Sequence, residues 1–271
     1  MPPSFDAHAG KMMAETGEAD VMNHEGAIYL FGGVVLGKGK GAKRAMPGSM
    51  PPHKGDATPA APTPKAALLA VAAGTTQFVA ECDLPTSKGL FRLRSYRYKG
   101  VGKEHEPVVM VAGDLSGGNN INVRVHDQCQ TSEVLGSLKC DCREQLDLAL
   151  RYIQEHGGAV IYLQQEGRGI GLANKVAAYN LQDKGMDTVD ANRELGFDDD
   201  QRSYECVRFI LEDMGIRSIN LMTNNPYKVA WLQSLGVTVN DRVPVVIKPN
   251  PHNEKYLQAK VERMSHLINN L

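Results

Sequence analysis

Three of the chain's five cysteines lie within fourteen residues of one another. Cys140 and Cys142 flank a single aspartate in the stretch SLKCDCREQL, and Cys129 precedes them in RVHDQCQTSE. Residues i and i+2 of an extended segment point to the same side, so Cys140 and Cys142 can hold one ion, which Cys129 can reach from a neighbouring strand or loop. Three thiolates suit zinc and leave its fourth tetrahedral position open, as in catalytic zinc sites.

A simpler interpretation is that these cysteines are small buried apolar side chains. The C-x-C pair alone would favour it. The third cysteine favours the metal site, and so does the helix predicted directly after Cys142, whose positive end stabilises thiolates. Cys82 and Cys206 have no such neighbours, and we expect Cys206 to lie in the core.

Two loops between predicted strands and helices carry phosphate-binding residue types. The stretch QQEGRGIGLANK (164–175) offers glycines, a helix N-terminus and Arg168, but it matches neither G-x-G-x-x-G nor a Walker loop. The stretch MTNNPYK (222–228) offers a hydroxyl, amides and a lysine. The alternatives are a plain glycine-rich turn for the first loop and helix capping by Thr or Asn for the second.

The elements that must position these residues alternate along the second part of the chain. Apolar and β-branched runs predict strands at 108–114, 121–127, 159–163 and 218–223. Apolar residues at helical spacing predict helices at 143–158, 171–185, 203–215 and 227–236, with one more near the C-terminus. This interleaving predicts the α/β class.

Composition excludes several classes of protein. The 271 residues carry a formal net charge of −1, which gives no electrostatic argument for binding nucleic acid or a membrane surface. No apolar run approaches the roughly 20 residues of a transmembrane helix. The start of the chain has no basic segment before an apolar core, so we expect no secretory signal. Few cysteines and no export signal predict a reduced compartment, the cytoplasm.

The chain changes character near residue 77. Residues 27–37 form a short apolar island, and residues 47–64 hold six of the fourteen prolines. That density of proline predicts an extended linker, so we assign residues 1–76 to a disordered, low-complexity extension and residues 77–271 to one catalytic domain. Organellar targeting and partner docking remain alternatives for the extension.

The motifs C-x10-C-x-C, Q-E-G-R-x-I-G-L, D-T-x-x-A-N-x-x-L-G and L-x-T-N-N-P-x-K follow one another in this order. Together they closely resemble GTP cyclohydrolase II, over about residues 85–268. The resemblance implies a single mixed-sheet domain and a homodimer that takes GTP with zinc and magnesium. It also implies the first step of riboflavin biosynthesis, in which GTP yields formate, pyrophosphate and 2,5-diamino-6-ribosylamino-4(3H)-pyrimidinone 5′-phosphate.

The resemblance also implies roles for individual residues. The zinc ligands would be Cys129, Cys140 and Cys142. The catalytic residues would be Asp200 as proton acceptor, Arg202 as nucleophile at the α-phosphate, and Tyr179. The contacts to GTP would be Arg124, Val125, His126, Asp127, Gln128, Gln145, Glu166, Gly167, Arg168, Thr188, Thr223 and Lys228. An arginine is rarely neutral, so a charge clamp on the leaving pyrophosphate is the easier role for Arg202, and Asp200 could instead cap the next helix.

One segment departs from the family pattern R-V-H-S-E-C-x-T-G-D. Asp127 and Gln128 replace Ser and Glu, and Ser132 and Glu133 replace Gly and Asp. This departure supports a second hypothesis, a zinc- and nucleotide-binding relative without catalysis. Because the zinc ligands and catalytic residues remain, we expect an active enzyme. The extension is too short for a fused second enzyme, so we expect a single activity.

Overall fold

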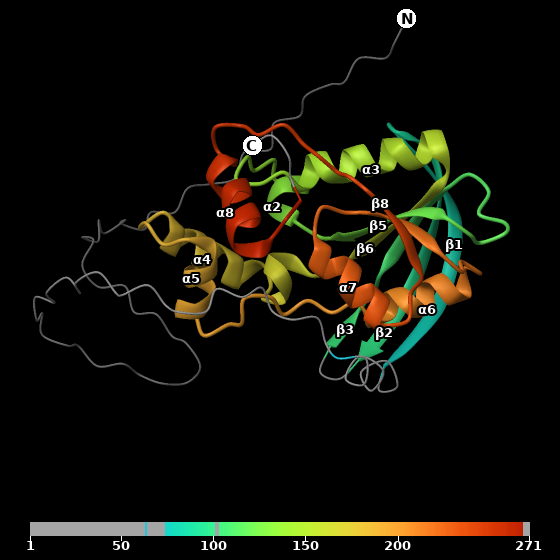
Figure 1. The fold of residues 1–271 in the computed structure, drawn as a ribbon, viewed down its shortest axis with the longest axis horizontal. Coiled ribbons are helices and arrows are strands. Elements are labelled where there is room, and N and C mark those ends of the chain that lie inside the picture. The colour runs from blue at the N-terminus through green and yellow to red at the C-terminus, as the bar shows by residue number, and fades with distance from the viewer. Residues whose placement is uncertain (1–62, 64–73, 101–102, 268–271) are drawn as a thin grey trace, which may run out of the picture. The chain divides into compact units, whose positions relative to one another are not determined.

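The computed structural model describes residue 63, residues 74–100 and residues 103–267 (Figure 1). Within these ranges eight strands form one sheet in the order β1-β2-β4-β6-β5-β7-β8, with β3 paired to β2. Four antiparallel strands continue into four strands that run parallel, so the predicted α/β class with one mixed sheet is confirmed. The apolar island and the proline-rich stretch fall outside the described residues.

The antiparallel half of the sheet begins with a long hairpin. This half contains β1 (Thr75–Thr86), β2 (Gly89–Gly100), β3 (Lys103–His105) and β4 (Val108–Ala112), and the hairpin joins β1 to β2. The Thr86 hydroxyl closes the turn by donating to the carbonyl of Gly89 at 2.9 Å, and Gly89 has a φ of +128° that favours glycine. The sequence did not predict the hairpin, and the expected boundary at residue 77 lies two residues inside β1.

The parallel half of the sheet sets up the functional edge of the protein. It contains β6 (Gly158–Leu163), β5 (Ile121–Asp127), β7 (Ile219–Met222) and β8 (Val239–Val243). Three of these four strands were predicted, and β8 was not. Because parallel strands end at the same edge, the loops that follow β5, β6 and β7 converge there, as in other open α/β sheets.

Helices cover both faces of the sheet (Figure 1). Helix α3 (Cys142–His156) packs on one face through Ala149, Leu150 and Ile153. Helices α6 (Glu205–Asp213) and α7 (Pro226–Ser234) pack on the other. The remaining helical segments are α2 (Gln130–Glu133), the 3-10 turn η1 (Glu166–Gly169), α4 (Leu172–Gln182), α5 (Thr188–Glu194) and α8 (Glu254–Met264).

The central strands are buried on both faces. Val160 contacts the α3 side of the core, whereas its neighbours Ala159 and Ile161 contact the α6 and α7 side. Cys206 lies in that second core with 1% of its surface exposed, as expected from the sequence. No helix in the described ranges is long and apolar enough to cross a membrane.

Removing residues 1–73 is expected to leave the melting temperature within about 2 °C of that of the full chain, since all β1 pairing is kept. Removing residues 1–80 should lower it clearly, because Thr75–Phe78 pair with Tyr96–Lys99 of β2 and the Phe78 ring contacts the Tyr96 ring. Thermal unfolding of the three proteins measures both effects. A large loss from the shorter deletion would show that the extension contributes to the fold.

Candidate active site

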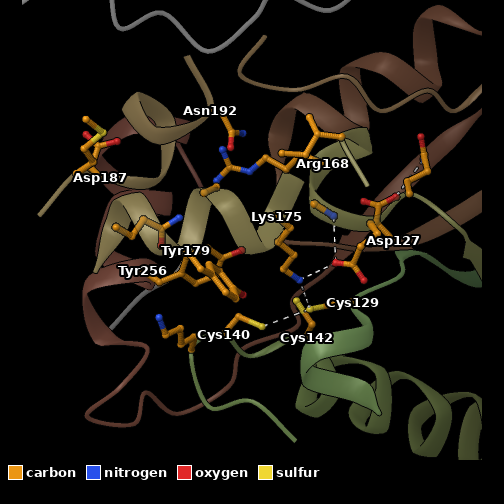
Figure 2. Close-up of a pocket in the computed structure, with 18 of the residues that line it drawn as sticks. Asp127, Cys129, Cys140, Cys142, Arg168, Lys175, Tyr179, Asp187, Asn192 and Tyr256 are labelled. Carbon is orange, nitrogen blue, oxygen red and sulfur yellow. Dashed lines mark hydrogen bonds and ion pairs between the residues drawn. The ribbon is translucent and has the colours of Figure 1, made fainter. Parts of the chain in front are cut away.

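A cavity of about 560 Å³ opens at the carboxyl edge of the parallel strands (Figure 2). Its walls come from the loops after β5 and β6, from the loop before α3, and from α4, α5 and α8. This volume falls in the range of small-molecule sites. Predicted residues from distant parts of the sequence therefore meet in one hollow.

The three predicted zinc ligands gather at one end of this cavity (Figure 2). Cys129 directly precedes α2, Cys140 lies in the loop before α3, and Cys142 is the first residue of α3. Their sulfur atoms all lie within 4.8 Å of one another, and those of Cys129 and Cys140 are 3.6 Å apart. Three converging thiols beside a helix N-terminus are a donor set that fits one zinc ion.

Lys175 on α4 couples the cysteines to the glycine-rich loop. Its Nζ donates to Cys129 Sγ at 3.0 Å and to Glu166 Oε1 at 2.6 Å. Glu166 Oε2 in turn accepts from the backbone N–H of Gln130 at 2.6 Å. Burial would lower the pKa of Lys175, but Glu166 and Cys129 outweigh it and raise that pKa. A charged ammonium therefore lies beside the sulfur cluster.

Asp127, Asp200, Arg202 and Lys228 form a second group, which we call the Asp127 cluster. Asp127 Oδ2 accepts from Arg202 Nη1 at 2.7 Å, from Lys228 Nζ at 2.9 Å and from the Tyr204 hydroxyl at 3.0 Å. Arg202 Nε also donates to Asp200 Oδ1 at 2.8 Å. The two carboxylates and two cations of the cluster balance in formal charge.

Burial would raise the pKa of Asp127, but Lys228 and Arg202 outweigh it and hold that pKa well below its usual range. Burial lowers the pKa of Lys228 to about 8 despite the attraction of Asp127. Burial would also lower the pKa of Arg202, yet Tyr204, Asp200 and Asp127 raise it well above its usual value. The guanidinium of Arg202 thus stays charged.

Replacing Asp127 with asparagine is expected to lower the free energy of unfolding by about 3 kcal/mol, because two largely buried cations lose a shared carboxylate. Chemical denaturation measures the loss. Asp198→Asn is the matched control, since Asp198 is exposed and should change stability by less than about 0.5 kcal/mol. Equal stability of the two variants would contradict a central role for Asp127 in the cluster.

The glycine-rich loop owes part of its composition to packing. Gly169 has a φ of +91°, and a Cβ there would come within 2.9 Å of the backbone of Gln201. The backbone N–H of Gln201 donates to the carbonyl of Arg168 at 3.0 Å. Arg168 has a φ of +60°, an uncommon conformation for a non-glycine residue, and lines the cavity. The loop is therefore fixed against the segment that carries Asp200 and Arg202.

Two capping alternatives from the sequence are now decided. Helix α6 starts at Glu205 with Tyr204 at its N-cap, so Asp200 does not cap it. Asn225 caps α7 by accepting from the backbone N–H of Tyr227 at 2.9 Å, and the Thr223 hydroxyl accepts from Asn225 N–H at 3.1 Å. Thr223 therefore has a turn-forming role of its own.

Glu133, in the segment that departs from the family pattern, helps to hold Cys129 in place. Glu133 Oε1 lies 2.8 Å from His126 Nε2 and accepts from the backbone N–H of Cys129 at 2.9 Å. Its other oxygen accepts from the Tyr162 hydroxyl at 2.6 Å. Burial lowers the pKa of His126. Because a carboxylate only accepts, the ring donates from Nε2–H to Glu133.

The predicted site residues divide into two sets. Those that line the cavity are Asp127, Gln128, Cys129, Cys140, Cys142, Glu166, Gly167, Arg168, Tyr179 and Arg202. Those outside its lining are Arg124, Val125, His126, Gln145, Asp200, Thr223 and Lys228. Asp200 and Lys228 belong to the Asp127 cluster, whereas Arg124, Val125, His126 and Thr223 are buried in and after β5 and β7, and Thr188 begins α5.

Several cavity residues were not predicted. Lys175 stands at the end of the quoted glycine-rich motif, one helical turn before Tyr179, and that spacing was the available signal. Gln165, Asp187 and Asn192 also belong to quoted motifs. Lys139, His252 and Tyr256 line the cavity without any local sequence signal.

Comparison with known proteins identifies GTP cyclohydrolases and a riboflavin biosynthesis protein as relatives. The family model of GTP cyclohydrolase II matches residues 76–244. A GTP cyclohydrolase-2 from Campylobacter fetus is 50% identical over 186 residues, which cover 69% of this chain and 93% of the relative. One from Hahella chejuensis is 47% identical over 192 residues, 70% of this chain and 92% of the relative. The riboflavin biosynthesis protein RibBA from Endomicrobium trichonymphae is 47% identical over 198 residues, 72% of this chain but 49% of the relative.

Proposed function

Since the chain belongs to the GTP cyclohydrolase II family, hydrolases of riboflavin biosynthesis, we propose that it hydrolyses GTP with zinc and magnesium. The products would be formate, pyrophosphate and 2,5-diamino-6-ribosylamino-4(3H)-pyrimidinone 5′-phosphate. The observation that carries the proposal is the convergence of three cysteine sulfurs within 4.8 Å at one end of a cavity whose wall also contains Arg168 and Arg202.

The cysteine end of the cavity would act on the purine ring. Zinc held by Cys129, Cys140 and Cys142 would supply Lewis-acid chemistry and activate water for attack near neutral pH. Lys175 donates to the Cys129 sulfur and so offsets part of the negative charge that three thiolates bring together. Burial raises the pKa of Tyr179, so its hydroxyl stays protonated and can donate to the substrate.

The Asp127 cluster and Arg168 would serve the phosphate end of GTP, with magnesium shared between the phosphates. Arg202 is held by Asp200 and Asp127 and keeps its charge, which supports the electrostatic clamp over the covalent nucleophile. Asp200 would orient this clamp and accept a proton. Gln128, Glu166 and Gly167 would contact GTP directly. The predicted contact residues that do not line the cavity would reach GTP after the surrounding loops adjust to the bound substrate.

The remaining parts of the proposal follow the resemblance and the composition: a homodimer in the cytoplasm, with no nucleic acid or membrane partner. The second candidate function is a zinc- and nucleotide-binding protein without catalysis. Its support is the replacement of Ser and Glu by Asp127 and Gln128 beside the first cysteine.

The test is to incubate the purified full chain with GTP, magnesium and zinc, and to measure formate and pyrophosphate separately. We expect the two products in equal amounts, and after zinc is removed with a zinc-selective chelator we expect no formate and a smaller loss of pyrophosphate. Calorimetry with GTP on the same sample identifies the second candidate, because that protein would bind GTP and release neither product.

A further inference from the structure

Asp141 stands between two of the cysteines and has an unusual arrangement of hydrogen bonds. It occupies the N-cap position of α3, where a carboxylate usually accepts from backbone N–H groups, yet its side chain makes no such bond. The hydroxyl of Ser132 accepts from the backbone N–H of Arg143 instead, at 3.2 Å. The Asp141 carboxylate is therefore available to side-chain donors.

That carboxylate is held from two sides. Lys260 Nζ donates to Asp141 Oδ1 at 2.9 Å, and Gln145 Nε2 donates to Oδ2 at 2.6 Å. The side chains of Lys260 and Asp141 are only 11% and 3% exposed. A buried ion pair is seldom more stabilising than an apolar pair of the same volume, so its contribution is better sought in the geometry that it fixes.

Lys260 belongs to α8, 119 residues after Asp141 and beyond the residues 76–244 that the family model matches. The helix is anchored by Leu257, which is 1% exposed, and its Tyr256 lines the cavity beside the cysteines. The Lys260 ammonium lies 4.4 Å from the centre of the Tyr256 ring. One helix therefore forms a wall of the cavity and holds the loop that carries Cys140 and Cys142.

The same network continues inward. Gln145 Oε1 accepts from Arg124 Nη2 at 2.6 Å, and Arg124 Nη1 donates to the carbonyl of Met222 at 2.9 Å. Asp141 is thus connected to α8 on one side, and to the middle of β5 and the end of β7 on the other. A carboxylate fixed at both oxygens constrains the backbone of the C-x-C segment.

We propose that Lys260 is a positioning residue for the metal site, and that the Lys260–Asp141 pair clasps the C-x-C loop in its metal-binding geometry. The inference rests on the proposed function, which assigns zinc to the three cysteines. Replacing a residue that holds metal ligands in position typically lowers metal affinity about 10- to 100-fold.

The experiment compares Lys260→Met, Lys260→Arg and Lys248→Met in the full chain. Zinc affinity is measured by competition with a chromophoric chelator, and ligand geometry by the visible spectrum of the cobalt-loaded protein. We expect Lys260→Met to weaken zinc about 10- to 100-fold and to change the cobalt bands, whereas Lys260→Arg stays within about threefold of the native chain. Lys248 is exposed, so Lys248→Met controls for the substitution itself.

A double-variant cycle tests the pair directly. Asp141→Asn should weaken zinc as Lys260→Met does, and the combined variant should bind no more weakly than either one, because all three remove the same interaction. Where Lys260→Met fails to unfold cooperatively, the comparison of Asp141→Asn with Lys260→Arg provides the test. Additive losses, or native zinc affinity and cobalt bands in Lys260→Met, would overturn the clasp.

A Cys140→Ser protein separates the two levels of the argument. If that protein loses zinc while Lys260→Met keeps it, the clasp is wrong and the metal site stands. If Cys140→Ser keeps zinc, the metal assignment itself fails.

Discussion

A Cys140→Ser protein is expected to lose its zinc and to stop releasing formate from GTP. Serine replaces a soft thiolate by a hard hydroxyl that stays protonated, and two thiolates on their own hold zinc weakly. In the proposed function ring opening depends on activation by zinc, so formate should fall below about one hundredth of the native rate. Emission spectroscopy gives the metal content, and formate is assayed on the same samples.

Pyrophosphate should respond less to this substitution than formate does. Its release is a displacement at phosphorus, which magnesium and Arg202 can still support. Cys82→Ser is the control, because Cys82 is exposed on β1 and far along the sheet from the cavity. A Cys140→Ser protein with one zinc per chain and normal formate release would remove the basis for the catalytic metal site.

Local spacing explains how much of this site could be predicted from the sequence. The C-x-C pair and the loops after three predicted strands depend on residues within a few positions of one another. Because parallel strands end at one edge, the sequence alone is enough to expect Cys129, Glu166 and Lys228 near that edge. The structure confirms the mixed sheet and brings the three sulfurs together.

The features missed from the sequence depend on distant contacts. Most residues of β1 are exposed, so its sequence lacks the alternation that marks a half-buried strand. Lys260 resembles any lysine on the solvent face of a helix, and only the fold places it against Asp141. In the sequence Asp127 was one of four departures from the family pattern, whereas the structure makes it the shared partner of Arg202, Lys228 and Tyr204.

The position of Asp127 also changes how that departure is understood. The family pattern has serine here, which would leave Arg202 with one carboxylate, Asp200, and would remove the carboxylate that Lys228 contacts. Asp127 therefore reduces the net positive charge at the proposed phosphate end. The neighbouring change of Glu to Gln128 removes a negative charge, so the total for the segment is preserved while its location moves by one residue.

Arg202→Ala is expected to lose both formate and pyrophosphate, with kcat lower by about a thousandfold, the scale of an arginine that stabilises charge in phosphoryl transfer. The substitution also leaves Asp127 and Asp200 without their shared guanidinium, so unfolding must be measured to show that the variant is folded under assay conditions. Arg97→Ala is the control, because Arg97 is exposed on β2.

Arg202→Lys distinguishes a clamp from a covalent nucleophile. Lysine keeps the positive charge but lacks the planar fork, so a clamp should retain part of the activity, at a rate between those of Arg202→Ala and the native chain. A covalent nucleophile must bond to the α-phosphorus through a nitrogen with a free electron pair. The side chain of lysine is shorter and its amine is protonated, so Arg202→Lys would then be nearly as inactive as Arg202→Ala. Native protein quenched during turnover would also carry a phosphorus adduct on Arg202, detectable by mass spectrometry. Such an adduct would contradict the clamp, because a guanidinium whose charge is maintained by Asp127 and Asp200 has no free electron pair for attack.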